Sequence, residues 1–181
     1  RYTNTALNVW QDVLYPLQVE DDNTCKGCKV QKVYNNMWNT IRVNVTNDLV
    51  AIQKQTKLNT LYITGISLGG GLAGISFIDI RVENLKVTTF GAPRVGNSKW
   101  AAFFDDVTGN KSLRYIVFED PITVLPSCLT LLCNYKQTGV QIVCKEATQQ
   151  CVVNTTVPES LVSKANVIVN HVKGDIKNVR S

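Results

Sequence analysis

Ser67 stands between two glycines in the stretch LYITGISLGGGLAGISF, which covers residues 61–77 and contains the pattern G-x-S-x-G. A serine hydroxyl becomes a nucleophile only when a base removes its proton and an acid orients that base. The spacing alone fits either a nucleophile on a sharp strand-to-helix turn or a glycine-rich bend that contains a serine. The apolar alternating run before Gly65 predicts a strand and the residues after Ser67 predict a helix, and this context favours the nucleophile.

Four glycines close to Ser67 have expected packing roles. Side chains at Gly65 and Gly69 would collide with neighbouring backbone in a tight turn, so both glycines are expected to be required. Gly70 and Gly71 weaken a helix by propensity, and their presence makes sense if the helix packs closely against the sheet.

The base and the acid have one clear candidate each. His171 is the only histidine, and its place after Ser67 fits the chain order nucleophile, acid, base of α/β-hydrolases. A lone histidine can also be a partly exposed loop residue, but the context of Ser67 favours the base. Asp120 ends the run LRYIVFED and precedes Pro121, which favours an extended backbone. Catalytic groups project from the carboxyl ends of strands in such sheets, so Asp120 is the preferred acid and Glu119 its nearest rival.

The elements that must position these residues alternate between strands and helices. Strands are expected over residues 60–65, 85–91 and from Ser112 onward, and helices over 30–52, 68–82 and from Asn97 onward. Further along, the run GVQIVC is β-like and a helical pattern begins at Glu159. This alternation predicts an α/β fold with a mostly parallel sheet flanked by helices, in a single domain over residues 1–181.

Composition excludes several classes of protein. The 181 residues fit one domain, and 44% apolar with 18% charged residues is typical of a globular protein. No apolar run is long enough to cross a bilayer. The net charge of +5 comes from scattered residues, with no Lys/Arg cluster interleaved with aromatics, so no nucleic-acid partner is expected.

The cysteines and sequons favour an oxidising compartment. Six cysteines fall into three close pairs, Cys25 with Cys28, Cys128 with Cys133 and Cys144 with Cys151. This spacing suits local disulfides and argues against zinc, because the only histidine lies far away in sequence. Asn-x-Ser/Thr sequons stand at Asn44, Asn110 and Asn154. Together they predict a secreted glycoprotein or a resident of a secretory or lysosomal compartment. The chain begins at Arg1 rather than Met, which we interpret as processing or truncation.

Four segments in the right order resemble the class 3 lipases, whose best-studied members are secreted fungal triacylglycerol lipases. They are YITGISLGGGLAG around the serine, FGAPRVGN, FEDPITVLP around the acid, and NVIVNHVKG around the histidine. The resemblance implies an α/β-hydrolase fold with Ser67 as nucleophile, Asp120 as acid and His171 as base. It further implies that Thr3, in the run RYT, forms an oxyanion hole with the backbone N–H of Leu68. No metal and no cofactor is implied.

Three features depart from the family pattern. Ile66 replaces the usual histidine before the serine, which should change packing more than chemistry. Tyr2 replaces the usual glycine beside Thr3. The family's helix and early strands before this point are missing, so we expect a partial domain with an open sheet edge.

The resemblance implies an enzyme that cleaves carboxylic esters of lipids, at an oil–water or membrane surface, through an acyl-enzyme intermediate. Alternatives are a phospholipase A1-type or feruloyl-type esterase of the same fold, and a non-enzymatic lipid-binding or storage domain. Residues 4–14, NTALNVWQDVL, could form a helix with one apolar face. That helix would be either a lid over the active site or an ordinary surface helix.

Overall fold

The computed structural model describes residues 18–20, 25–57, 59–80, 82–126, 134–145 and 150–153. The expected α/β fold with a mostly parallel sheet and helices is confirmed. The larger sheet has the strand order β3 (Thr60–Ile66), β4 (Asn84–Phe90), β6 (Ser112–Val117), β8 (Val140–Lys145) and β9 (Gln150–Val153). β3, β4, β6 and β8 pair in parallel and β9 is antiparallel to β8. Among the described residues β3 forms one edge of this sheet.

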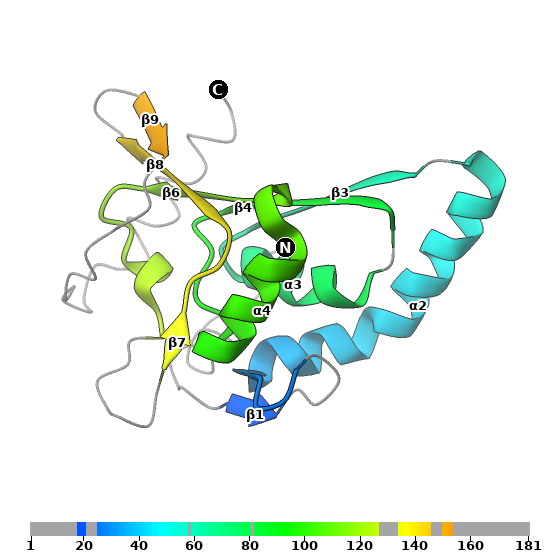
Figure 1. Ribbon diagram of the computed structural model, residues 1–181, viewed down its shortest axis with the longest axis horizontal. Helices are drawn as coiled ribbons and strands as arrows, with labels where there is room; N and C mark the ends of the chain where they lie inside the picture. Colours follow the sequence, from blue (N-terminus) through cyan, green and yellow to red (C-terminus); the bar gives the residue numbers. More distant parts are fainter. Residues whose placement is uncertain are drawn as a thin grey trace, which may run out of the picture.

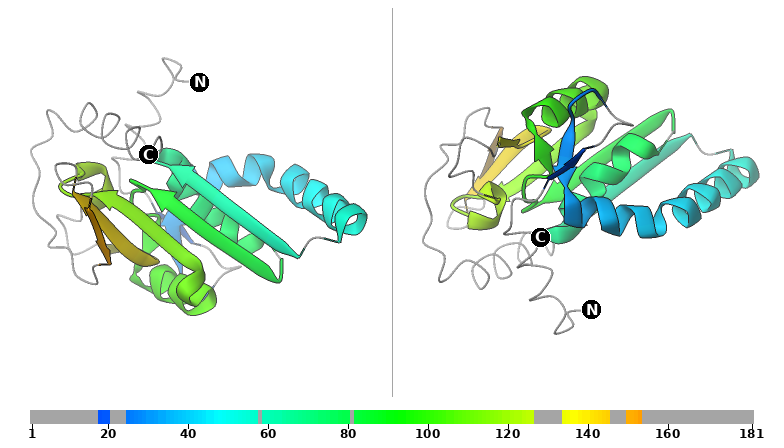
Figure 2. Two further views of the ribbon diagram at one scale, coloured as in Figure 1. Left: turned by 90° about the horizontal axis from the view of Figure 1, so that it is seen from above. Right: turned by 90° about the horizontal axis from the view of Figure 1, so that it is seen from below.

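Three helices lie on one side of the larger sheet (Figures 1 and 2). They are α2 (Lys32–Thr56), α3 (Leu68–Asp79) and α4 (Ser98–Thr108). α3 packs against β3 and β4, and α2 packs on α3. Short 3-10 helices follow α4 and β6, η1 (Gly109–Lys111) and η2 (Pro121–Val124). The described helices include none that is long and apolar enough to span a membrane.

A second, antiparallel sheet was not predicted. Its strand order is β1 (Gln18–Glu20), β2 (Lys29–Gln31), β5 (Gly96–Asn97) and β7 (Tyr135–Lys136). β5 and β7 have only two residues each, too few for a recognisable period-2 pattern. Gly96 pairs with Lys136, so this sheet ties the segment before α4 to the segment before β8.

The predicted helix over residues 30–52 forms, but only its first half lies in the core. Val30 belongs to β2, and the helix itself runs from Lys32 to Thr56. Tyr34 and Trp38 are buried, whereas Ile41 and Ile52 on the same periodic pattern are exposed. The far end of α2 projects away from the rest of the described chain (Figure 1). Apolar periodicity thus predicted the helix and overestimated how much of it is covered.

Other sequence predictions fall close to the observed bounds. α3 ends at Asp79, earlier than residue 82, and the predicted strands match β3, β4 and β6 within one residue at the ends that were specified. Asn97 is the N-cap of α4, where its side chain accepts a hydrogen bond from the N–H of Trp100 at 2.9 Å. The helical pattern from Glu159 lies outside the described residues.

Two predicted disulfides are present, Cys25–Cys28 and Cys144–Cys151. Cys128 and Cys133 lie outside the described residues. Within the described part of the chain, no three His, Cys, Asp or Glu side chains cluster as metal ligands would.

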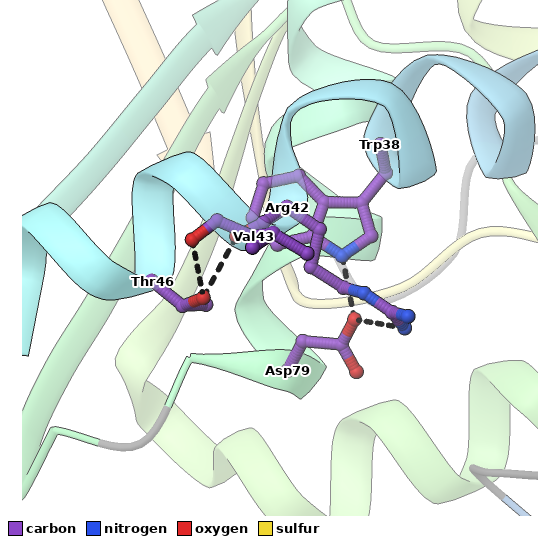
Figure 3. Close-up of polar contacts among 5 residues, drawn as sticks. All are labelled: Trp38, Arg42, Val43, Thr46 and Asp79. Carbon is purple, nitrogen blue, oxygen red and sulfur yellow. Dashed lines mark hydrogen bonds and ion pairs between the residues drawn. The ribbon is translucent and has the colours of Figure 1, made fainter.

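A polar contact fastens α3 to α2 at the end opposite Ser67 (Figure 3). The buried Trp38 donates its Nε1–H to Asp79 Oδ2 at 2.5 Å. Arg42 Nη1 lies 3.5 Å from the same oxygen. An anion at the C-terminal end of a helix is unfavourable for the helix dipole, so these two donors stabilise Asp79 where it stands.

We expect Asp79→Ala to lower the free energy of unfolding by about 1–3 kcal/mol, because the buried indole N–H of Trp38 then loses its acceptor. Asp79→Asn should cost less, since it keeps an acceptor oxygen and loses only a solvent-exposed ion pair. Urea unfolding measures both, with Asp48→Ala on the exposed side of α2 as control. Equal midpoints for all three variants would contradict the proposed role of this contact.

Candidate active site

Ser67 occupies a strained backbone conformation where β3 turns into α3. Its φ of 56° and ψ of −123° lie in a region that residues with a side chain rarely adopt. The Ser67 N–H donates to the carbonyl of Phe90 at 2.8 Å, and the Ser67 carbonyl accepts the N–H of Gly70 at 2.9 Å. The half-buried serine is therefore held at the carboxyl end of β3 by its own backbone. Such strain costs on the order of 1–3 kcal/mol and is concentrated at functional sites.

Gly65 is required by this turn, as predicted. A Cβ at Gly65 would lie 2.1 Å from the carbonyl oxygen of Gly69. The prediction for Gly69 itself is wrong, since a Cβ there would meet no described atom within 4 Å beyond its chain neighbours and the backbone of its own helix. Gly69 thus contributes its backbone, and of these two glycines it is Gly65 that must lack a side chain.

The two following glycines allow close packing, as expected, with Gly70 close to β3 and the turn after β4 and Gly71 close to α2. A Cβ at Gly71 would lie 2.4 Å from the ring of Tyr34 on α2, and one at Gly70 would lie 2.7 Å from Ala92 Cβ. Burial raises the pKa of the Tyr34 hydroxyl, so the ring is neutral under ordinary conditions. α3 is therefore seated by backbone contact against α2 and the turn that follows β4.

Leu68 is the first residue of α3. Its N–H is one of the first four of the helix, which find no acceptor within the helix. The positive end of the helix dipole lies at the same point. This is a suitable environment for the oxyanion of a tetrahedral intermediate.

Asp120 follows β6 and caps η2. Its side chain is buried, with 8% of its surface exposed, and Oδ1 accepts the N–H of Ile122 at 2.9 Å. The Asp120 carbonyl accepts the hydroxyl of Thr123 at 2.7 Å. Pro121 occupies the first turn of η2 and Asp120 is extended, as the sequence predicted.

Glu119 differs from Asp120 in both burial and backbone. Its side chain is exposed and its φ is +66°, so the chain turns sharply there. A buried carboxylate held by a backbone N–H is better suited to orient an imidazole than a solvated one. The geometry favours Asp120 over Glu119 as the acid.

The described catalytic candidates lie at the same end of the larger sheet, where its parallel strands have their carboxyl ends. Ser67 and Asp120 come after the carboxyl ends of two parallel strands, β3 and β6, with only β4 between them. Loops after such strands form the active sites of open α/β sheets. His171 and Thr3 lie outside the described residues, as do residues 4–14.

Two arginines are buried in this region, Arg94 in the turn after β4 and Arg114 on β6. Arg94 is 3% exposed and donates from Nη1 to the carbonyl of Pro126 at 3.2 Å. Burial, and to a smaller degree the charge of Arg94, lowers the pKa of Arg114 to about 10. Asp105 lies near Arg114, and burial raises the pKa of that carboxyl.

Comparison with known proteins identifies the family. The sequence profile of the family Lipase (class 3) matches residues 1–130. The chain belongs to the class 3 lipases. Secreted mono- and diacylglycerol lipase 2 of Gibberella zeae is 33% identical over 120 residues, which are 59% of this chain and 29% of that protein. A Caenorhabditis elegans lipase is 37% identical over 75 residues, 38% of this chain and 21% of its own. The chain thus spans less than a third of these relatives.

Solved structures agree with this class 3 lipase in fold. Lipase II from Rhizopus niveus has a TM-score of 0.73 at 23% identity, over 86% of this chain and 59% of its own. A triacylglycerol lipase whose catalytic centre is a serine protease triad has a TM-score of 0.72 at 22% identity, over 94% and 65%. At this level of identity the likeness shows the α/β-hydrolase fold.

The glycine contacts predict different outcomes for neighbouring substitutions in this lipase. Gly65→Ala should remove reaction of Ser67 with a fluorescent alkyl phosphonate and lower the thermal unfolding temperature, because the new Cβ collides with backbone that cannot move independently. Gly69→Ala should keep the fold and be as stable as the parent or more so, since alanine favours a helix by about 1 kcal/mol over glycine. Differential scanning fluorimetry reports both stabilities. A folded, phosphonate-reactive Gly65→Ala protein would show that the turn tolerates a side chain.

Proposed function

We propose that this class 3 lipase domain is a serine hydrolase that cleaves carboxylic esters of lipids. The observation that carries the proposal is Ser67, held at positive φ between a parallel strand and a helix N-terminus. Maintaining such strain makes physical sense when the hydroxyl must be presented at the sheet edge for reaction. A purely lipid-binding domain would have no need of it.

The proposed reaction has two steps. His171 takes the proton of Ser67 Oγ as the oxygen attacks the ester carbonyl, and the imidazolium then protonates the departing alcohol as the carbon–oxygen bond breaks. Water, activated by His171 in the same way, attacks the acyl-serine and releases the carboxylic acid. Asp120 orients the imidazole and stabilises its charged form. The N–H of Leu68 and the hydroxyl of Thr3 donate to the oxyanion in both steps.

The substrate and location follow from relatives and chemistry. Three relatives are named secreted mono- and diacylglycerol lipases, which supports a glyceride as substrate. The disulfides Cys25–Cys28 and Cys144–Cys151 suit a secreted protein that works in an oxidising compartment. Glycerides with long acyl chains collect at oil–water or membrane surfaces, so we place the reaction there. The proposal requires no metal or cofactor.

Substitution of the triad tests this proposal. Ser67→Ala should abolish both phosphonate labelling and hydrolysis of a monoacylglycerol while leaving the unfolding temperature nearly unchanged. Asp120→Asn should lower kcat by on the order of 10⁴-fold through misorientation of the imidazole. Glu119→Gln is the matched control on the exposed neighbour and should retain nearly full activity.

Hydrolysis is followed by titration of the released acid, and labelling by gel fluorescence. Retained labelling in Ser67→Ala would place the nucleophile elsewhere. A larger loss in Glu119→Gln than in Asp120→Asn would reassign the acid.

A further inference from the structure

The turn after β4, residues 91–94, stands between the nucleophile and the acid. On one side the Ser67 N–H donates to the carbonyl of Phe90 just before the turn, and Gly70 packs directly against Ala92. The turn is joined to the next strand as well, because the N–H of Gly91 donates to the carbonyl of Tyr115 at 2.8 Å. These contacts fix the position of Ser67 relative to the turn.

On its other side the same turn holds the loop of the acid. The N–H of Arg94 donates to the carbonyl of Leu125 at 2.7 Å, and its guanidinium donates to the carbonyl of Pro126. Both acceptors follow η2, the short helix that Asp120 caps. The segment that follows η2 is thus hydrogen-bonded to the turn after β4.

Gln137 connects the turn after β4 directly to η2. Its side-chain amide donates to the carbonyl of Ala92 in the turn at 3.2 Å and to the carbonyl of Thr123 inside η2. Thr123 in turn donates its hydroxyl to the Asp120 carbonyl. One amide group therefore links the turn that seats Ser67 with the helix that Asp120 caps.

We infer that Gln137 is a positioning residue that sets Asp120 relative to Ser67 and thereby affects how Asp120 orients the imidazole of the proposed base. The inference rests on the proposed function. Two acceptors demand two protons on one atom, which an amide supplies and a carboxylate or thioether does not. The antiparallel sheet explains how Gln137 reaches this place, because β7 ends one residue earlier and pairs with β5.

Gln137→Glu tests the inference, because it keeps the shape of the side chain, removes both donors and sets a charge against two carbonyls. We expect kcat per labelled serine to fall by about 10- to 100-fold with KM changed less than about twofold, since a displacement of about 1 Å costs on the order of 100-fold. The acid limb of the kcat/KM profile should move to lower pH. A carboxylate close to an imidazole raises the imidazole pKa, so a misplaced Asp120 raises it less.

Two further variants separate this role from general stability. Gln137→Met also loses both donors but carries no charge, and it should shift kcat and the acid limb in the same direction. Gln141→Glu makes the same chemical change close by but keeps the oxygen that accepts from Arg114, so it should behave like the parent. Counting only enzyme that reacts with the phosphonate removes unfolded molecules from the comparison.

The outcomes are distinguishable. Lower kcat with a shifted acid limb in both Gln137 variants, and neither change in Gln141→Glu, supports the inference. Parent-like kcat in Gln137→Met, or a loss of rate with an unmoved acid limb, overturns it. Failure of the parent protein to react at Ser67 would instead overturn the proposed function together with this inference.

Discussion

The close approach of Gly65 to the backbone of Gly69 and Gly70 is the constraint on which the rest of the site depends. Without a Cβ at residue 65, the chain reverses from β3 into α3 within one residue, and that residue is Ser67 at positive φ. The reversal is unfavourable locally, so it persists only where its surroundings determine it. Here the surroundings are the Phe90 carbonyl, the ring of Tyr34 and the turn at Ala92. The fixed far end of α3, at Asp79, keeps the whole helix in register with them.

Parallel strand pairing converts this local geometry into a site. Ile66 is opposite Phe90, and Phe90 is opposite Tyr115, so β3, β4 and β6 end at nearly the same level. Residues that follow these strands must emerge side by side, whatever their separation in sequence. This register brings Ser67 and Asp120 to the same end of the sheet, and the turn after β4 separates them. The antiparallel sheet then adds a side chain, Gln137, from a segment distant in sequence.

The sequence predicted those parts of the fold that leave a local signal. Strands β3, β4 and β6 have runs of apolar and β-branched residues, and Ser67 has the strand-to-helix context of a nucleophile. Burial depth has no such signal, since the outer half of α2 continues the apolar periodicity although Ile52 is exposed. Likewise, the sequence carries no signal for the positive φ and the exposed side chain of Glu119, which support Asp120 as the acid.

Long-range pairing explains most of what the sequence could not give. β5 and β7 are two residues long and exist only because Gly96 meets Lys136 across the fold. Gln137 matches no motif, since its role depends on two carbonyl groups that lie far away in sequence, at Ala92 and Thr123. His171 and Thr3 stay predictions from the sequence and the family resemblance.

The buried Arg114 supports this site through hydrogen bonds that do not change over the pH range in which an imidazole titrates. Arg114 donates to the carbonyl of Thr138 and to Gln141, and so holds the segment that carries Gln137. Although burial lowers its pKa, the value of about 10 leaves Arg114 charged throughout the range in which an imidazole, with an ordinary pKa near 6.5, gains or loses its proton. Charge-assisted hydrogen bonds of this kind are stronger than neutral ones and are not weakened until Arg114 deprotonates. Between mildly acidic and mildly basic pH Arg114 therefore keeps its charge and its two hydrogen bonds, so a change of rate with pH in that range does not arise from this arginine.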